Sequence, residues 1–103
     1  MALNVEVKDH NGRLKLAMSG RFDFNSNRDF RKAYEEGMNR YPSGPIEIDF
    51  SGVDYMDSSA LGMLLLFKER ASEQDRSIAL LNCQDSVREI LDVVNFGKLF
   101  AIQ

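Results

Sequence analysis

Segments with the apolar period of a strand and segments with the apolar period of a helix alternate along this chain of 103 residues. Over residues 3–8 and again over 14–18, apolar side chains occupy every second position, as is typical of half-buried strands. The Asn11-Gly12 pair between them favours a tight hairpin turn, because such a turn needs two positive φ angles. The chain is therefore predicted to open with a β-hairpin.

Single helices separate the later predicted strands. Apolar residues between 30 and 38 recur at helical spacing, and the Pro-Ser-Gly-Pro run at 42–45 must end that helix. The next segments are expected to be a strand over 46–50, a short polar crossing over 51–57 and an apolar helix from Ser58 to about Ser72. A buried strand over 78–81 and a short helix over 87–94 follow, with a last strand available at 99–102.

This order of elements predicts an α/β fold. Strands joined by single helices need right-handed crossovers, which lay the helices over one face of the sheet. We therefore expect a mixed sheet of about four to five strands with helices packed mainly on one face, and one domain over residues 1–103. Phe96, Leu99 and Phe100 are assigned to the core rather than to a ligand pocket.

Composition excludes several classes of protein. A hydrophobic content of 44% argues against a disordered chain, and no apolar run approaches the length of about 18 residues needed for direct membrane insertion. A net charge of −3 without a basic block argues against a nucleic-acid partner. One cysteine and one histidine cannot build a disulfide framework or a Cys/His zinc site. The start lacks the apolar segment of a signal peptide, so a cytoplasmic location is expected.

The start of the apolar helix carries the candidate chemistry. Asp57 is predicted to be its N-cap, with the carboxylate accepting hydrogen bonds from free N–H groups of the first turn. Ser58 then falls at the first helical position, where its hydroxyl points outward beside the positive end of the helix dipole, and Ser59 follows. Capping alone would also explain an Asp-Ser-Ser run, so these residues by themselves do not establish a functional site.

The rest of this helix divides into two arcs at about 100° per residue. The arc assigned to the core comprises Leu61, Leu64, Leu65, Phe67 and Ala71, and the arc assigned to solvent is centred on Glu69, Arg70 and Glu73. Leu66 lies in the polar arc and Met63 at its edge, so both could form a small docking patch with Ser59, although single exposed leucines are common. Gly62 costs about 1 kcal/mol relative to alanine, which favours either close packing on a neighbouring loop or approach of a partner's backbone.

Catalysis and metal binding find little support in the residues. A serine nucleophile needs an adjacent base, but the only histidine, His10, falls in the predicted hairpin turn, and no G-x-S-x-G elbow occurs. Asp49, Asp54 and Asp57 lack the spacing of a calcium loop, so no metal is predicted. No glycine-rich phosphate loop occurs, and no cofactor is expected.

The run Asp-Ser-Ser-Ala-Leu-Gly at 57–62, preceded by Asp-Phe-Ser-Gly-Val at 49–53, resembles the signature of bacterial anti-sigma factor antagonists, which are single-domain STAS proteins. The resemblance covers almost the whole chain, including the Gly-Arg-Phe-Asp turn at 20–23 and the closing residues 94–100. Ala60 stands where the family usually has glycine, a change that raises helix propensity and leaves the hydroxyl in place.

The resemblance implies a non-catalytic partner switch. In that family, an anti-sigma factor that is also an ATP-dependent serine kinase phosphorylates the first serine of the pair, and a PP2C-type phosphatase reverses the reaction. Carried over, this makes Ser58 the expected phosphoacceptor, with Ser59 as second choice. The implied partner-binding residues are Asp23, Asp57, Ser59, Gly62, Met63 and Leu66. The unphosphorylated protein, expected to be a monomer when free, would bind the anti-sigma factor, and phosphorylation would release it.

Other outputs remain open at this point. STAS domains also serve as regulatory parts of anion transporters and lipid-transport systems, and a switch of this kind could control secretion, motility or biofilm formation. Two adjacent serines and the lack of a transporter segment favour the phosphorylation switch. Repulsion from Asp57 and Asp23 is expected to add to the effect of a phosphate on partner binding, with little change in the fold.

Overall fold

Across residues 2–103, which the computed structural model describes, five strands form one mixed sheet. They are β1 (Asn4–His10), β2 (Arg13–Phe22), β3 (Ile46–Met56), β4 (Ile78–Leu81) and β5 (Ala101–Ile102). The strands lie in the order β1-β2-β3-β4-β5, with β1 antiparallel to β2 and the other neighbouring pairs parallel. The predicted mixed sheet is confirmed.

The predicted hairpin joins β1 to β2. His10 pairs with Arg13 across the turn, and the two residues between them have positive φ angles, 55° at Asn11 and 81° at Gly12. The Asp9 carboxylate accepts a hydrogen bond from the Gly12 N–H at 2.9 Å. The Asn-Gly pair thus supplies the backbone geometry that the tight turn requires.

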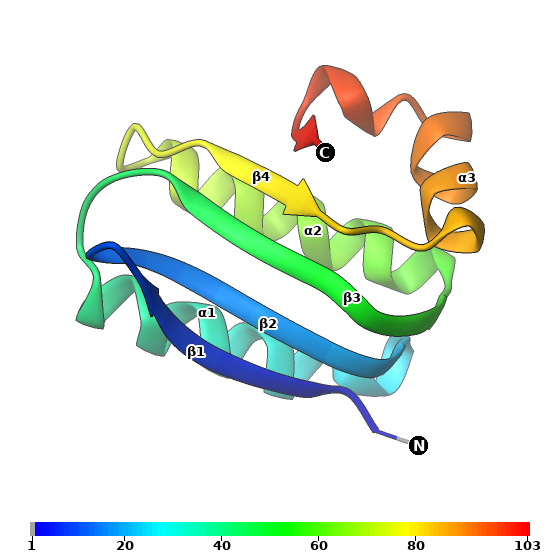
Figure 1. The fold of residues 1–103 in the computed structure, drawn as a ribbon, viewed down its shortest axis with the longest axis horizontal. Helices are drawn as coiled ribbons and strands as arrows, with labels where there is room; N and C mark the ends of the chain where they lie inside the picture. Colours follow the sequence, from blue (N-terminus) through cyan, green and yellow to red (C-terminus); the bar gives the residue numbers. More distant parts are fainter. Residues whose placement is uncertain (1) are drawn as a thin grey trace.

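Two helices lie side by side across one face of the sheet (Figure 1). They are α1 (Asn27–Arg40) and α2 (Ser58–Ser72), and α3 (Asp85–Val93) follows the end of β4. Two short 3₁₀ helices, η1 (Phe24–Ser26) and η2 (Phe96–Lys98), precede α1 and β5. The expectation that helices pack mainly on one face is confirmed.

Aromatic rings fill the space between the sheet and these two helices. The Phe30 ring of α1 lies 4.9 Å from the Phe22 ring of β2 and 5.8 Å from the Phe67 ring of α2, measured between centroids. Tyr34 stacks on Phe67 with 4.3 Å between centroids. Burial raises the pKa of the Tyr34 hydroxyl, and the neighbouring Glu35 carboxylate acts in the same direction. This cluster fixes α1 and α2 relative to each other, and therefore fixes the surface between them.

The polar crossing predicted over 51–57 is wrong, because β3 continues through Met56. Two register shifts between β2 and β3 change the spacing of buried residues, so Phe50, Val53 and Met56 point inward at every third position. Gly52 permits the close approach of the strands, since a Cβ there would lie 2.6 Å from the Cβ of Ser19. Asp54, which falls within the predicted crossing, lies within the strand.

The C-terminal segment differs from the prediction in one core residue. Phe96 and Phe100 are buried with their ring centroids 5.6 Å apart, as expected. Leu99, assigned to the core, is 43% exposed. Asn95 adopts a left-handed conformation with φ of 60°, and η2 then turns the chain, which leaves Leu99 outside and shortens the last strand to Ala101–Ile102.

Candidate functional site

Asp57 joins the end of β3 to the start of α2 and also holds a neighbouring loop. Its Oδ1 accepts a hydrogen bond from the Ala60 N–H at 3.1 Å, which confirms the predicted N-cap. Its Oδ2 accepts from the Phe24 N–H at 3.3 Å, and its own N–H donates to the Phe22 carbonyl at 3.3 Å. One carboxylate therefore connects the N-terminus of α2 to η1, which lies 33 residues earlier in the chain.

The η1 loop has its own internal hydrogen bonds. The Asp23 carboxylate accepts from the Asn25 N–H at 3.0 Å. It also accepts from the backbone of Ser26, and the Ser26 hydroxyl accepts from the Asp23 N–H at 3.1 Å, which together form a capping box. Asp23 also lies 3.6 Å from Nε of Arg21. The structure thus brings the Asp23 loop next to Asp57, while the Asp23 carboxylate itself contacts its own loop.

Ser58 is the first residue of α2 and is exposed to solvent, whereas Ser59 is partly buried. The helix N-terminus places unpaired backbone N–H groups and the positive end of the dipole beside the Ser58 hydroxyl. The Ser58 hydroxyl is therefore accessible without any change in the fold, and it is more accessible than that of Ser59.

The exposed face of α2 differs from the predicted one at two positions. Leu65, which was assigned to the core, is 42% exposed, and Met63, which was placed at the edge of the polar arc, is only 6% exposed. The inward direction is set by four residues with no exposure, namely Ala60, Leu64, Phe67 and Ala71. At about 100° per residue, Met63 lies about 70° from the mean of these four and Leu65 about 130° from it.

Leu66 is exposed, as predicted, with 59% of its surface accessible. Between it and Ser58 lies Gly62, where an added Cβ would have no atom within 4 Å. Close packing of Gly62 on a loop of this chain is therefore ruled out among the described residues, and the surface of α2 is open at this position. We call Ser58, Gly62, Leu65 and Leu66 the Ser58 face.

Phe24 is a surface residue that the sequence analysis missed. It is 72% exposed in the η1 loop, and its backbone N–H is bonded to Asp57. The sequence does contain a signal for this exposure, because Phe24 is an aromatic residue between Asp23 and Asn25 in a polar loop that precedes a helix. Exposed aromatic side chains on a fixed backbone are frequent anchors of protein interfaces.

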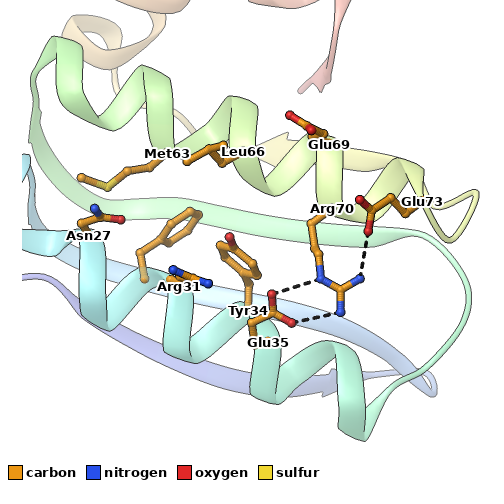
Figure 2. A pocket seen from close by; sticks show the side chains of 10 residues that line it. Asn27, Arg31, Tyr34, Glu35, Met63, Leu66, Glu69, Arg70 and Glu73 are labelled. Carbon is orange, nitrogen blue, oxygen red and sulfur yellow. Dashed lines mark hydrogen bonds and ion pairs between the residues drawn. The ribbon is translucent and has the colours of Figure 1, made fainter.

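A groove of about 330 Å³ runs between α1 and α2, next to the Ser58 face (Figure 2). Leu66 and Met63 of α2 line one side, and Asn27 and Arg31 of α1 line the other. The groove joins the Ser58 face to the η1 side of the molecule, because Asn27 and Arg31 also border the hollow that contains Phe24.

Charged residues close the far end of this groove (Figure 2). Nε and Nη2 of Arg70 donate to the two carboxylate oxygens of Glu35 at 3.1 and 3.2 Å, and Nη1 donates to Glu73 at 3.4 Å. The hydrogen bonds from Arg70 to Glu35, together with the charge of Glu35, raise the pKa of the guanidinium. This end of the groove is therefore highly charged, whereas the end near Ser58 combines the apolar Met63 and Leu66 with the polar Asn27 and Arg31.

Asp49 lies on the opposite, open face of the sheet. Its carboxylate accepts from the Ser51 N–H at 2.9 Å and from Nδ2 of Asn82 at 3.2 Å, with Nζ of Lys15 at 3.9 Å. Partial burial acts to raise the pKa of Asp49, but these hydrogen bonds outweigh burial and hold the pKa below its usual value. Asp49 thus stabilises β3 beside its bulge and is separate from the Ser58 face.

Three further features of residues 2–103 bear on function. No group of three or more His, Cys, Asp or Glu side chains in this part of the chain is arranged to hold a metal ion. None of the helices in the same residues is long and apolar enough to cross a membrane. Burial raises the pKa of the half-buried Cys83 thiol, which disfavours its reactive thiolate form.

The family model described as "Mlab, STAS domain" matches residues 5–101. This chain belongs to the STAS domain family. A STAS-domain containing protein of Pseudomonas aeruginosa is 40% identical over 105 residues, with 99% of each chain covered. An anti-sigma F factor antagonist of Paenibacillus polymyxa is 26% identical over 102 residues, covering 99% of this chain and 87% of the relative.

Solved structures share this STAS fold. A protein of Thermotoga maritima assigned as an anti-sigma factor antagonist has a TM-score of 0.83 at 20% identity, over 95% of this chain and 84% of the other. The anti-sigma factor antagonist SpoIIAA in its unphosphorylated form has a TM-score of 0.78 at 18% identity, over 97% and 88%. The murine solute carrier 26 family member A9 anion transporter has a TM-score of 0.71 at 18% identity, over 84% of this chain and 14% of the transporter.

Proposed function

We propose that this STAS protein is an anti-sigma factor antagonist whose binding to an anti-sigma factor is switched by phosphorylation of Ser58. The unphosphorylated protein binds the anti-sigma factor through the Ser58 face and releases the transcription factor that the anti-sigma factor holds. Phosphorylation of Ser58 ends this binding. The proposal rests on one observation above all: Ser58 is exposed at the first position of α2, beside the exposed Leu65 and Leu66.

The similarity to named proteins supports the same assignment. The Paenibacillus polymyxa relative, which this chain matches over nearly its whole length, is an anti-sigma F factor antagonist. The partner of this chain is then an anti-sigma factor that also acts as an ATP-dependent serine kinase, and a PP2C-type phosphatase restores the free hydroxyl. The chain itself acts by binding and catalyses no reaction, is a monomer when free, and works in the cytoplasm, where the kinase finds ATP.

The charge of the phosphate explains why one modification would be sufficient. A phosphate adds about −1.5 to −2 charges at neutral pH. A helix N-terminus favours an anion by about 0.3–1 kcal/mol, but this gain is present in the free and bound protein alike and does not affect binding. Burial of the phosphate against Leu66 removes its hydration in the bound state only, and an uncompensated buried charge is expensive. Its repulsion by Asp57 is present in the free protein as well, but it strengthens in the complex, where water is excluded. The balance is therefore against the complex.

Two measurements test the proposal. Incubation of the protein with a lysate of its own organism and ATP, followed by mass spectrometry, is expected to show phosphate on Ser58. The kinase captured by the unmodified protein is then titrated against variants. Ser58→Ala should bind with an affinity close to that of the natural protein, and Ser58→Asp should bind at least about tenfold more weakly, a difference of about 1.4 kcal/mol.

Ser72→Asp is the matched control, because Ser72 is an exposed serine at the other end of α2. It adds the same charge to the same helix away from the Ser58 face and should leave the affinity unchanged. Equal binding by Ser58→Asp and Ser58→Ala would refute the switch. Phosphate found on Ser59 with Ser58 unmodified would transfer the acceptor role to Ser59.

A role as a regulatory module of a transporter is the second candidate. The fold similarity to the solute carrier 26 anion transporter favours it, because that similarity covers 84% of this chain. In that case the partner would be recovered from the membrane fraction, and its binding would be the same for Ser58→Asp and the natural protein. Switches whose output is secretion, motility or biofilm formation would retain the Ser58 dependence and differ only in the protein captured.

A further inference from the structure

A second cavity lies at the end of the sheet opposite to Ser58. Its volume is about 250 Å³, and it is bordered by the β1–β2 turn, the first residues of β3 and β4, and β5. Figure 1 shows the β1–β2 turn at the same end of the sheet as the start of β4. Ser58 comes two residues after the end of β3, so the length of that strand separates the two places. The inference drawn from this cavity does not depend on the proposed function.

Arg76 lies in the wall of the cavity and is only 6% exposed. Its Nε donates to the Gly44 carbonyl at 2.8 Å, and its two Nη atoms donate to the Ser43 carbonyl at 3.4 Å and to Gln74 Oε1 at 3.3 Å. All three acceptors are neutral, and within residues 2–103 no carboxylate forms an ion pair with this guanidinium.

A buried guanidinium without an anion is costly. An arginine carries five N–H donors, of which Arg76 uses three in the described part of the chain. Buried charges in proteins are normally paired, because an unpaired one loses its hydration without compensation. Burial lowers the pKa of Arg76, in the direction expected for a cation that lacks a partner. A bound anion would supply the missing charge.

Other cations border the same cavity. Arg13 and Lys68 line it, and neither forms an ion pair with any residue of 2–103. The one carboxylate in the lining belongs to Glu47, and it is already paired with Nδ1 of His10. The cavity therefore carries an excess of positive charge in a chain whose net charge is −3.

Besides the polar residues Asn11 and Ser77, the remaining wall is mostly apolar. Pro45, Ile78, Leu99 and Ala101 line it, and Leu99 is the residue that the fold leaves 43% exposed. Pockets for drug-sized ligands occupy about 300–1,000 Å³, so a cavity slightly below that range suits a smaller molecule. Its lining combines a cationic part with a short apolar part.

We propose that this cavity binds a small organic oxyanion, with a carboxylate or phosphate head facing Arg76, Arg13 and Lys68 and a short apolar body against Leu99. The oxyanion accepts hydrogen bonds from the donors of Arg76 that the protein leaves free. Charged hydrogen bonds of this kind are roughly twice as strong as neutral ones, which makes the head group the main source of affinity.

The test uses three probes of similar size, namely butyrate, butyl phosphate and the neutral butyramide. Each is titrated at pH 7 into the ¹⁵N-labelled protein and followed by NMR. At least one of the two anions is expected to shift the amide signals of residues 46–47 and 76–79, with a dissociation constant at least about tenfold below that of butyramide. The tighter of the two identifies the preferred head group. Equal affinity for all three probes, or absence of shifts at these residues, would overturn the proposal.

A pair of double variants separates local charge from net charge. R13Q/K68Q removes two cations from the cavity and keeps Arg76, whose bonds to Ser43 and Gly44 support the fold. R28Q/K32Q is the matched control, because it removes two cations from α1 at the hollow beside Phe24. R13Q/K68Q should weaken binding of the preferred anion at least about tenfold, whereas R28Q/K32Q should change it less than about twofold. Equal losses in the two variants would show that net charge alone attracts the anion and would contradict the proposed site.

Discussion

At the scale of single residues, Asp57 is the point on which the candidate site depends. It is an N-cap, which is a local function, and it is also the acceptor for the Phe24 N–H from a distant loop. Oδ1 of its carboxylate accepts the capping bond, and Oδ2 accepts the bond from Phe24. A change at Asp57 therefore affects the helix start and the position of the η1 loop together, whereas a change at Ser58 affects only the exposed hydroxyl.

Asp57→Ala is expected to lower the free energy of unfolding by about 1 kcal/mol, since loss of an N-cap typically costs about 0.5–2 kcal/mol. Urea denaturation measures this difference. Asp54→Ala is the control, because Asp54 is an exposed aspartate three residues earlier, in β3, and its loss should cost less than about 0.5 kcal/mol. Equal effects of the two changes would mean that the cap contributes nothing beyond its charge.

Gly62→Ala separates folding from binding. The change should raise the free energy of unfolding by about 1 kcal/mol, because a mid-helix glycine is replaced where nothing lies within 4 Å of the new Cβ. If a partner's backbone approaches Gly62, the same change weakens partner binding. Gly37→Ala in α1 is the contrasting variant, because its new Cβ would lie 2.6 Å from Cδ1 of the buried Leu14. This variant should gain less stability than Gly62→Ala, or lose stability. Higher stability with unchanged partner affinity would remove Gly62 from the interface.

At the scale of elements, β3 is the strand that positions the site. The alternation of apolar and polar residues ends before the strand does, because β3 has two irregularities in its pairing with β2. Met56 therefore still belongs to the sheet, and Asp57 begins the turn into α2. Asp49 stabilises the first bulge by accepting from the Ser51 N–H at 2.9 Å. The neighbouring strand contributes as well, through Asn82 after β4. The site thus rests on a strand fixed from both sides.

The stability that Asp49 contributes should depend on pH. Its hydrogen bonds hold the pKa of the folded state below the usual value, against the effect of burial. The contribution of Asp49 to the free energy of unfolding is therefore full above the unfolded pKa of about 3.9, and it is lost as the pH falls through the lower folded pKa. Asp49→Asn should therefore be about 1 kcal/mol less stable than the natural protein at pH 7, with the gap closing toward pH 3. Urea denaturation across this range measures the gap, with Asp54→Asn as control. A gap that is constant with pH would contradict the assigned hydrogen bonds.

At the scale of the whole molecule, the two candidate sites occupy opposite ends of one rigid sheet. The Ser58 face lies where β3 ends, and the cationic cavity lies where β3 and β4 begin. The aromatic cluster of Phe22, Phe30, Tyr34 and Phe67 lies between α1, α2 and the sheet and resists rearrangement. A switch in such a molecule acts by changing its surface.

Ser58→Asp is therefore expected to leave the fold unchanged while it weakens partner binding. The amide signals that shift should belong to residues near the N-terminus of α2 and to the η1 loop, and the free energy of unfolding should change by less than about 1 kcal/mol, because the added charge lies at the favourable end of the helix dipole. NMR spectra and urea denaturation measure both quantities. Shifts spread over α1 and the far strands would indicate a conformational switch instead.

Local rules were sufficient for much of this structure. The hairpin follows from the Asn-Gly turn, the start of α2 follows from the Asp57 cap, and the exposure of Ser58 follows from its position next to that cap. Each of these depends on hydrogen bonds and spacing within a few residues, which the order of amino acids specifies directly. The exposure of Leu66 was predictable for the same reason.

Contacts between distant segments decided the rest. The length of β3 depends on bulges opposite β2, and the burial of Met63 together with the exposure of Leu65 depends on where α1 packs. The Asp57 bond to Phe24 spans 33 residues, and the cationic cavity collects side chains from several strands and from α2. Periodicity within one segment cannot specify these features, because it records which side of an element is apolar and not which neighbour will cover it.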